Sequence, residues 1–195
     1  MRQEADMNAD LLFRMACGFH HTGIYSAGLL QNSGTKPFTM IGPAAVNFAL
    51  ATELYLKAIH LLNKIRPSDT HELWKLFKTL PRITMELIER EYIQQLSTKP
   101  DLLKSIHMTV SRGAEDAQKE FPMSPDTVKK LLVRHNHSFI SWRYLHEFTS
   151  KGCDYHFDFH EMDIFCTALN AHIIKLLSAR IPHFGVTDVN TGEAV

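Results

Sequence analysis

The chain lacks the features that mark secreted and membrane-spanning proteins. It has only three cysteines, without a paired spacing, which argues against a disulfide framework and favours a reducing compartment. Its first residues carry charges where a signal peptide would have an apolar core. The longest apolar run, 44–62, is interrupted by Glu53 and Lys57, so we expect no transmembrane helix. These absences predict a cytoplasmic protein without a membrane partner.

An excess of charge of one sign is also missing. Lys plus Arg and Asp plus Glu both number 21, so the net charge indicates neither nucleic acid nor membrane as a partner. Glycine-rich phosphate-binding loops are absent from the sequence, and no cofactor is predicted. The distribution of charge is uneven, because 126–151 is mainly basic and 152–163 is acidic. A basic segment of this kind either binds nucleic acid or forms a solvated face.

What the sequence does contain is helical periodicity. Apolar residues recur with helical spacing in 10–30, 44–62, 72–80, 81–96, 99–119, 124–142 and 161–180. We therefore expect an all-α fold, an up-down bundle of about five to seven helices. Residues 1–181 should form one domain and 182–195 a flexible tail. Alternation in 152–160 predicts a strand or an extended loop. Internal glycines in the first helix, Gly18, Gly23 and Gly28, either break it or permit close packing against another helix or chain.

The segment 44–62 is apolar nearly all round and should lie in the middle of the bundle. Glu53, Lys57 and His60 nevertheless form one stripe along it, at spacings of four and three residues. A charge pair on a buried helix is unfavourable unless neighbouring groups match it. We therefore expect polar partners for Glu53 and Lys57, with Arg143 and His71 as candidates. Such a stripe marks either a binding site or a structural polar network.

Three short motifs resemble those of the HEPN superfamily of small helical domains. They are Glu53-x-x-x-Lys57-Ala, then His71-Glu-Leu-x-x-Leu-x-x-x-Leu-Pro, and later Trp-Arg143-Tyr-x-x-Glu147 before the last helix. The resemblance spans about residues 40–180. It implies a HEPN-like, homodimeric domain that handles RNA or a nucleotide, for example a metal-independent endoribonuclease in bacterial stress or defence. It also implies that Glu53, Lys57, His71 and Glu147 contribute to binding.

HEPN nucleases carry an Arg, four to six residues and then a His on a late helix. His can move a proton of the ribose 2′-hydroxyl, and Arg can stabilise the charge on the phosphate. This sequence departs from the motif, because Arg143 is followed too soon by His146. The pair nevertheless shares a helical face with Glu147, and we take Arg143 and His146 as the catalytic candidates. The alternative is an Arg143–Glu147 ion pair that stabilises the turn.

The spacing of the HEPN motif, an Arg, four to six residues and then a His, also occurs earlier in the chain than the late helix. It is found at Arg66 with His71 and at Arg14 with His20 or His21.

Two other classes of function compete with the nuclease. One is a non-catalytic helical interaction or regulatory protein. The other is a metal-binding protein: if 155–160 is extended, His156, Asp158 and His160 point to one side of the strand. Imidazoles with a carboxylate suit zinc, but no His-Glu-x-x-His spacing is present and the same residues would suit a solvent-facing strand. We therefore assign no metal.

Overall fold

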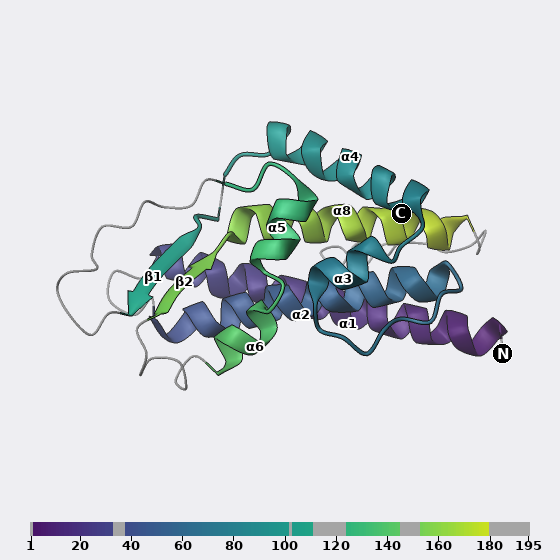
Figure 1. Cartoon of the computed structure of the whole chain (residues 1–195), viewed down its shortest axis with the longest axis horizontal. Coiled ribbons are helices and arrows are strands. Elements are labelled where there is room, and N and C mark those ends of the chain that lie inside the picture. Colours follow the sequence, from purple (N-terminus) through teal and green to yellow (C-terminus); the bar gives the residue numbers. More distant parts are fainter. Residues whose placement is uncertain (1, 33–37, 102, 111–123, 145–152, 180–195) are drawn as a thin grey trace.

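The computed structural model describes residues 2–32, 38–101, 103–110, 124–144 and 153–179. Within these ranges the chain is mostly helical, which confirms the all-α class (Figure 1). The helices are α1 (Arg2–Asn32), α2 (Phe38–Leu62), α3 (Leu73–Lys78), α4 (Arg82–Thr98), α5 (Val128–Arg134), α6 (Ser138–Arg143) and α8 (Phe159–Ser178). Two short strands, β1 (Ile106–Val110) and β2 (Cys153–Phe157), pair antiparallel.

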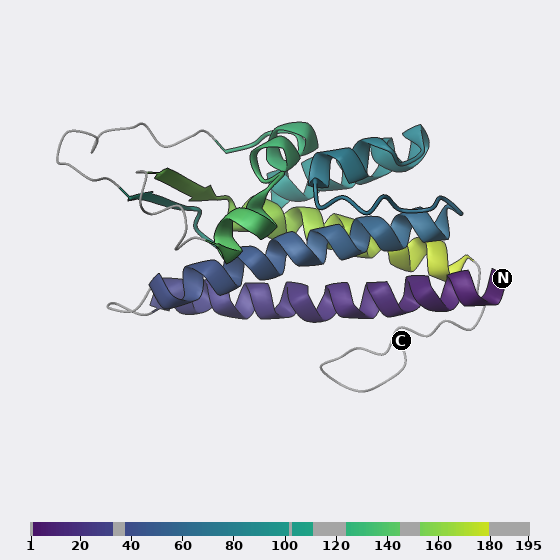
Figure 2. The same cartoon turned by 60° about the horizontal axis from the view of Figure 1, so that its bottom comes forward.

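Along the chain, the long helices α1, α2, α4 and α8 alternate in direction (Figure 1). Helices α1 and α2 form an antiparallel hairpin, α8 packs against both, and α4 covers the other side of α8 (Figures 1 and 2). The short helices α3 and α6 pack on α2, and α5 lies between α3 and α8. This arrangement places α2 and α8 in the centre of the bundle.

Helix α2 forms the core, as its apolar sequence predicts. Phe48, Tyr55, Leu56 and Ile59 are fully buried. The segment Thr39–Leu62 is long and apolar enough to cross a membrane, but 72% of its most apolar window is buried inside the fold. That burial is typical of the core helix of a water-soluble protein.

The internal glycines do not break the first helix. Helix α1 runs without interruption from Arg2 to Asn32, longer than predicted. At Gly23 an added Cβ would lie 3.0 Å from the Phe48 ring, whereas at Gly18 it would meet nothing within 4 Å. Gly23 is therefore needed for the close approach of α1 and α2, and Gly18 faces outward.

The predicted helix over 99–119 is wrong where Ile106–Val110 form strand β1. Its partner is β2, with Ile106 opposite Phe157 and Val110 opposite Cys153. Isoleucine, threonine and valine suit a strand, but Leu103, Ile106 and Val110 also follow a helical spacing, which explains the error. The rest of that segment, 111–119, lies outside the described residues, as does the predicted tail 182–195.

The segment predicted as one helix over 124–142 is divided into two. Helix α5 starts after Thr127, whose hydroxyl accepts a hydrogen bond from the Lys130 N–H at 3.2 Å. It ends at Arg134, and α6 begins at Ser138. In the turn between them, the Asn136 Oδ1 accepts a hydrogen bond from the Trp74 N–H at 3.0 Å. Asn136 thereby satisfies a free donor at the start of α3.

Candidate functional site

The buried carboxylate of Glu53 is the centre of the first polar cluster. Glu53 is 3% exposed, and the Lys57 Nζ lies 2.7 Å from its Oε1. The His71 Nδ1–H donates to both carboxylate oxygens, at 3.0 and 3.1 Å. Polar partners for Glu53 were predicted from the stripe on α2, and of the two candidates the structure selects His71 for direct contact.

His60, the third residue of the stripe, forms hydrogen bonds inside the protein. Its Nδ1–H donates to the Leu56 carbonyl at 2.7 Å, and its Nε2 accepts from the Thr79 hydroxyl at 2.9 Å. Burial lowers the pKa of His60, against the smaller opposing effect of the Leu56 carbonyl. A neutral imidazole with both nitrogens satisfied ties α2 to the end of α3, so His60 has a structural role.

Arg143 ends α6 at an exposed position and rests on aromatic rings. Its guanidinium carbon lies 4.9 Å from the Tyr144 ring centroid and 5.7 Å from that of Phe139. The Phe139 and His71 rings are 5.5 Å apart. Phe139, to which the sequence assigned no role, thus connects Arg143 to the Glu53 carboxylate through His71. No ion pair joins Arg143 to another described residue, including Glu53.

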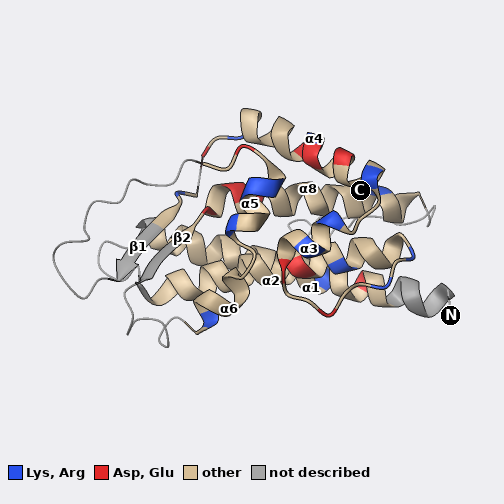
Figure 3. Cartoon of the chain, in the orientation of Figure 1, with Lys and Arg blue, Asp and Glu red and all other residues tan. Residues whose placement is uncertain are grey.

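We call Glu53, Lys57, His71, Phe139 and Arg143 the α2–α6 cluster. Figure 3 shows that α3 and α5 also carry basic residues. Within the cluster, the His71 side chain is 51% exposed and that of Lys57 is 19% exposed. The buried carboxylate holds Nδ1–H of His71, which leaves Nε2 as the acceptor of the neutral ring. The arrangement therefore offers a guanidinium for an anion and an oriented imidazole for a proton. His146 and Glu147 lie outside the described residues.

The second polar cluster surrounds Asp158, between β2 and α8. Asp158 is 1% exposed. Its carboxylate accepts hydrogen bonds from Arg134 at 2.8 and 3.1 Å, from His135 at 2.9 Å and from His156 at 2.7 Å. Burial alone would raise the pKa of Asp158, but the hydrogen bonds from His135 and His156 outweigh it and hold the pKa well below its usual range. This carboxylate joins the α5–α6 turn to the start of α8.

His135 completes this cluster from a fully buried position. Burial lowers its pKa, against the opposing effect of Asp158, so the ring is neutral and donates Nε2–H to the carboxylate. Its Nδ1 lies 3.1 Å from the Ser138 hydroxyl, which donates to it. Sequence inspection missed Arg134 and His135 because their partner lies 24 and 23 residues downstream.

The predicted alignment of His156, Asp158 and His160 is only partly correct. His156 and Asp158 do meet, but α8 already begins at Phe159, so the alternation stops before His160. The His160 Nδ1 instead lies 3.7 Å from an Asp101 oxygen. Within the described part of the chain, no three His, Cys, Asp or Glu side chains are arranged to hold a metal ion.

The two residues of the α1 match, Arg14 and His20, have separate partners. Arg14 pairs with Asp10 at 2.8 Å on the surface. His20 is 6% exposed, and its Nε2 lies 2.8 Å from an Asp163 oxygen on α8. His20 therefore helps to hold α1 against α8.

No family model, curated protein or solved structure matches this chain. The relationship to the HEPN superfamily stays a prediction from the sequence motifs.

Proposed function

We propose that this chain is a HEPN-like domain that binds RNA at the α2–α6 cluster and cleaves it without a metal. The observation that carries the proposal is the contact series from Arg143 through Phe139 and His71 to the buried Glu53. It unites residues that the sequence motifs singled out separately. The resemblance further suggests a bacterial stress or defence role, in the cytoplasm.

Arg143 is the proposed phosphate contact. A guanidinium presents several N–H donors in a plane and can bind two phosphate oxygens at once. Stacking on Phe139 and Tyr144 limits the motion of the side chain, and no described carboxylate competes for it. Loss of this contact should weaken RNA binding and make it less dependent on salt.

Among the histidines that the structure describes, His71 is the best placed to transfer a proton during RNA cleavage. In the proposed reaction its Nε2 accepts the proton of a ribose 2′-hydroxyl, and the 2′-oxygen attacks the adjacent phosphorus. The bond to the 5′-oxygen breaks, and that oxygen takes a proton from an acid, for which His146 is the candidate from the sequence. The products are a 2′,3′-cyclic phosphate and a 5′-hydroxyl. Glu53 orients His71 and stabilises the imidazolium that forms.

The test is an RNA-cleavage assay in EDTA. We expect His71→Ala and His146→Ala each to lower the rate by about 10²–10⁴, and Arg143→Ala to weaken binding. Arg82→Ala is the matched control, because Arg82 is an exposed arginine that pairs only with Glu86 among the described residues. Equal cleavage by the wild type and all four variants would contradict the proposal. So would a wild type that neither cleaves RNA nor binds it in a salt-dependent way.

A homodimer is part of the same proposal, and the outer face of α1 supports it. Leu11, Met15, Gly18, Thr22 and Tyr25 follow one another at alternating spacings of four and three residues, as in helices that pair. Leu11 and Tyr25 are 57% and 69% exposed, and Gly18 has open space beside it. Light scattering should show two copies per particle, and Leu11→Glu with Tyr25→Glu should yield 22.3 kDa monomers. A monomeric wild type at micromolar concentration would refute the dimer.

A non-catalytic interaction protein is the second candidate. Apolar side chains on the outer side of α4 favour it, because Ile83 and Ile93 are 70% and 53% exposed. Neither cleavage nor RNA binding by the wild type would leave this function as the better explanation.

A further inference from the structure

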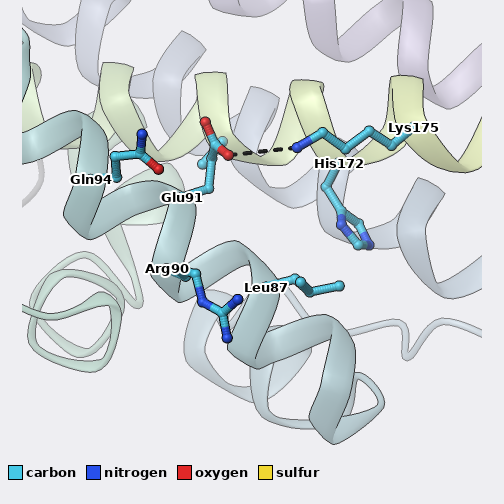
Figure 4. A pocket seen from close by; sticks show the side chains of 7 residues that line it. Leu87, Arg90, Glu91, Gln94, His172 and Lys175 are labelled. Carbon is cyan, nitrogen blue, oxygen red and sulfur yellow. Dashed lines mark ion pairs between the residues drawn. The ribbon is translucent and has the colours of Figure 1, made fainter.

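A cavity of about 230 Å³ lies between α4 and α8 (Figure 4). Leu87, Arg90, Glu91 and Gln94 line it from α4, and His172 and Lys175 line it from α8. None of these residues belongs to the α2–α6 cluster. At about 30 Å³ for each water-sized group, the cavity has room for about eight of them. That volume suits a small molecule or one end of a larger one.

The His172 imidazole is an unsatisfied polar group in the wall of this cavity. His172 is 9% exposed, and within the described chain its Nε2 has no hydrogen-bond partner. Burial lowers the pKa of His172, and Lys175 lowers it further, so the ring is neutral. Buried polar groups in folded proteins nearly always have a partner. The Nε2 atom itself is buried, so a turn of the ring toward the cavity would let an occupant provide that partner.

The charged groups around the cavity leave positive charge available. The Lys175 Nζ lies 3.6 Å from a Glu91 oxygen, and Glu91 also accepts a hydrogen bond from the Gln95 side chain at 2.7 Å. The Glu91 carboxylate is therefore already engaged. Arg90 is exposed and forms no ion pair with any residue that the structure describes.

We propose that this cavity binds a compact oxyanion, the carboxylate or phosphate group of a small molecule. Arg90 supplies the bidentate fork and Lys175 a second positive charge. The exposed Gln94 amide supplies a neutral donor, and the His172 Nε2–H supplies another once its ring turns toward the ligand. Leu87 contacts the apolar part of the ligand. The site is independent of RNA cleavage, so it stands if the α2–α6 cluster proves inactive.

The test is a titration of the intact protein with inorganic phosphate and, separately, with succinate, at constant ionic strength set with sodium chloride. Binding is followed by calorimetry and by the imidazole resonance of His172, which is assigned from its loss in His172→Gln. We expect saturable binding of at least one anion and a shift of that resonance. The preferred anion shows whether the natural ligand carries a phosphate or a carboxylate.

Arg90→Gln and Lys175→Gln should each weaken binding about tenfold, the loss expected for a charged hydrogen bond. Both side chains are exposed, so these variants should fold. Arg82→Gln removes an exposed arginine from the same helix and should leave the affinity unchanged. The proposal is overturned if neither anion binds saturably, if the His172 resonance does not move, or if Arg90→Gln and Arg82→Gln weaken binding equally.

Discussion

Replacing Asp158 by asparagine should destabilise the fold more than the corresponding replacement of Glu53 or Asp126 by its amide. Asn keeps the shape of the side chain but loses the charge and one acceptor oxygen. The Arg134 guanidinium, 26% exposed, then lies beside a neutral amide, and one of the imidazole donors loses its acceptor. Breaking a buried ion pair costs about 3–5 kcal/mol. Because Arg134 retains some contact with water, we expect a loss of about 3 kcal/mol in the free energy of unfolding.

For a chain of this size, that loss corresponds to a fall in Tm of about 6–12 °C. Urea unfolding and calorimetry of Asp158→Asn would measure it. Asp126→Asn is the matched control: Asp126 pairs with Lys130 at 2.8 Å, but the two side chains are 67% and 63% exposed. We expect no measurable change there. A loss below about 1 kcal/mol in Asp158→Asn, or equal effects in both variants, would refute the role assigned to the buried carboxylate.

The dependence of the free energy of unfolding on acid pH also tests the Asp158 cluster. The pKa of Asp158 in the folded protein is lowered below the value of about 3.9 for an unfolded Asp. Asp158 therefore stabilises the fold above pH of about 4, and this contribution is lost as the pH falls through the folded pKa. Asp158→Asn should accordingly flatten the acid limb of the stability profile. An unchanged acid limb would show that other groups cause it.

Three further changes test the packing and the polar contacts. Gly23→Ala should cost about 1–3 kcal/mol through overpacking against Phe48, 3.0 Å away, whereas Gly18→Ala should stabilise the helix by up to about 1 kcal/mol; equal effects on Tm would contradict this. Glu53→Gln should cost about 2–3 kcal/mol, since it leaves a partly buried lysine without its carboxylate, and denaturant unfolding would measure it. Burial raises the pKa of Cys17, so peptide mass spectrometry should find that iodoacetamide labels it slowly at pH 7 and faster after unfolding.

The parts of the fold that could be predicted depend on local patterns. The apolar circumference of α2 indicated its burial, and the same pattern made Glu53 conspicuous and implied a partner such as His71. Strand β1 could not be predicted in this way. Its apolar residues Ile106 and Val110 continue a helical spacing from Leu103, and only pairing with β2, far along the chain, selects the extended form.

The candidate site was predictable only as separate parts. Arg143, His71 and Glu53 were each conspicuous from their motifs. Their connection depends on Phe139, an aromatic residue that looks like any other core side chain in the sequence. Of the Asp158 cluster, only the meeting of His156 with Asp158 was predicted. Arg134 and His135 were not, because they reach this carboxylate only when the α5–α6 turn folds back onto β2 and α8.

The turn between α5 and α6 also has a consequence for the kinetics of folding. Asn136 bonds to Trp74, 62 residues earlier, while Arg134 bonds to Asp158, 24 residues later. Contacts between such distant residues require the closure of long loops, which lowers the rate at which they form. We expect this turn to reach its native geometry late, after α1 and α2 have paired. Asn136→Ala should then accelerate unfolding and leave the refolding rate nearly unchanged, so that the turn governs the lifetime of the folded state.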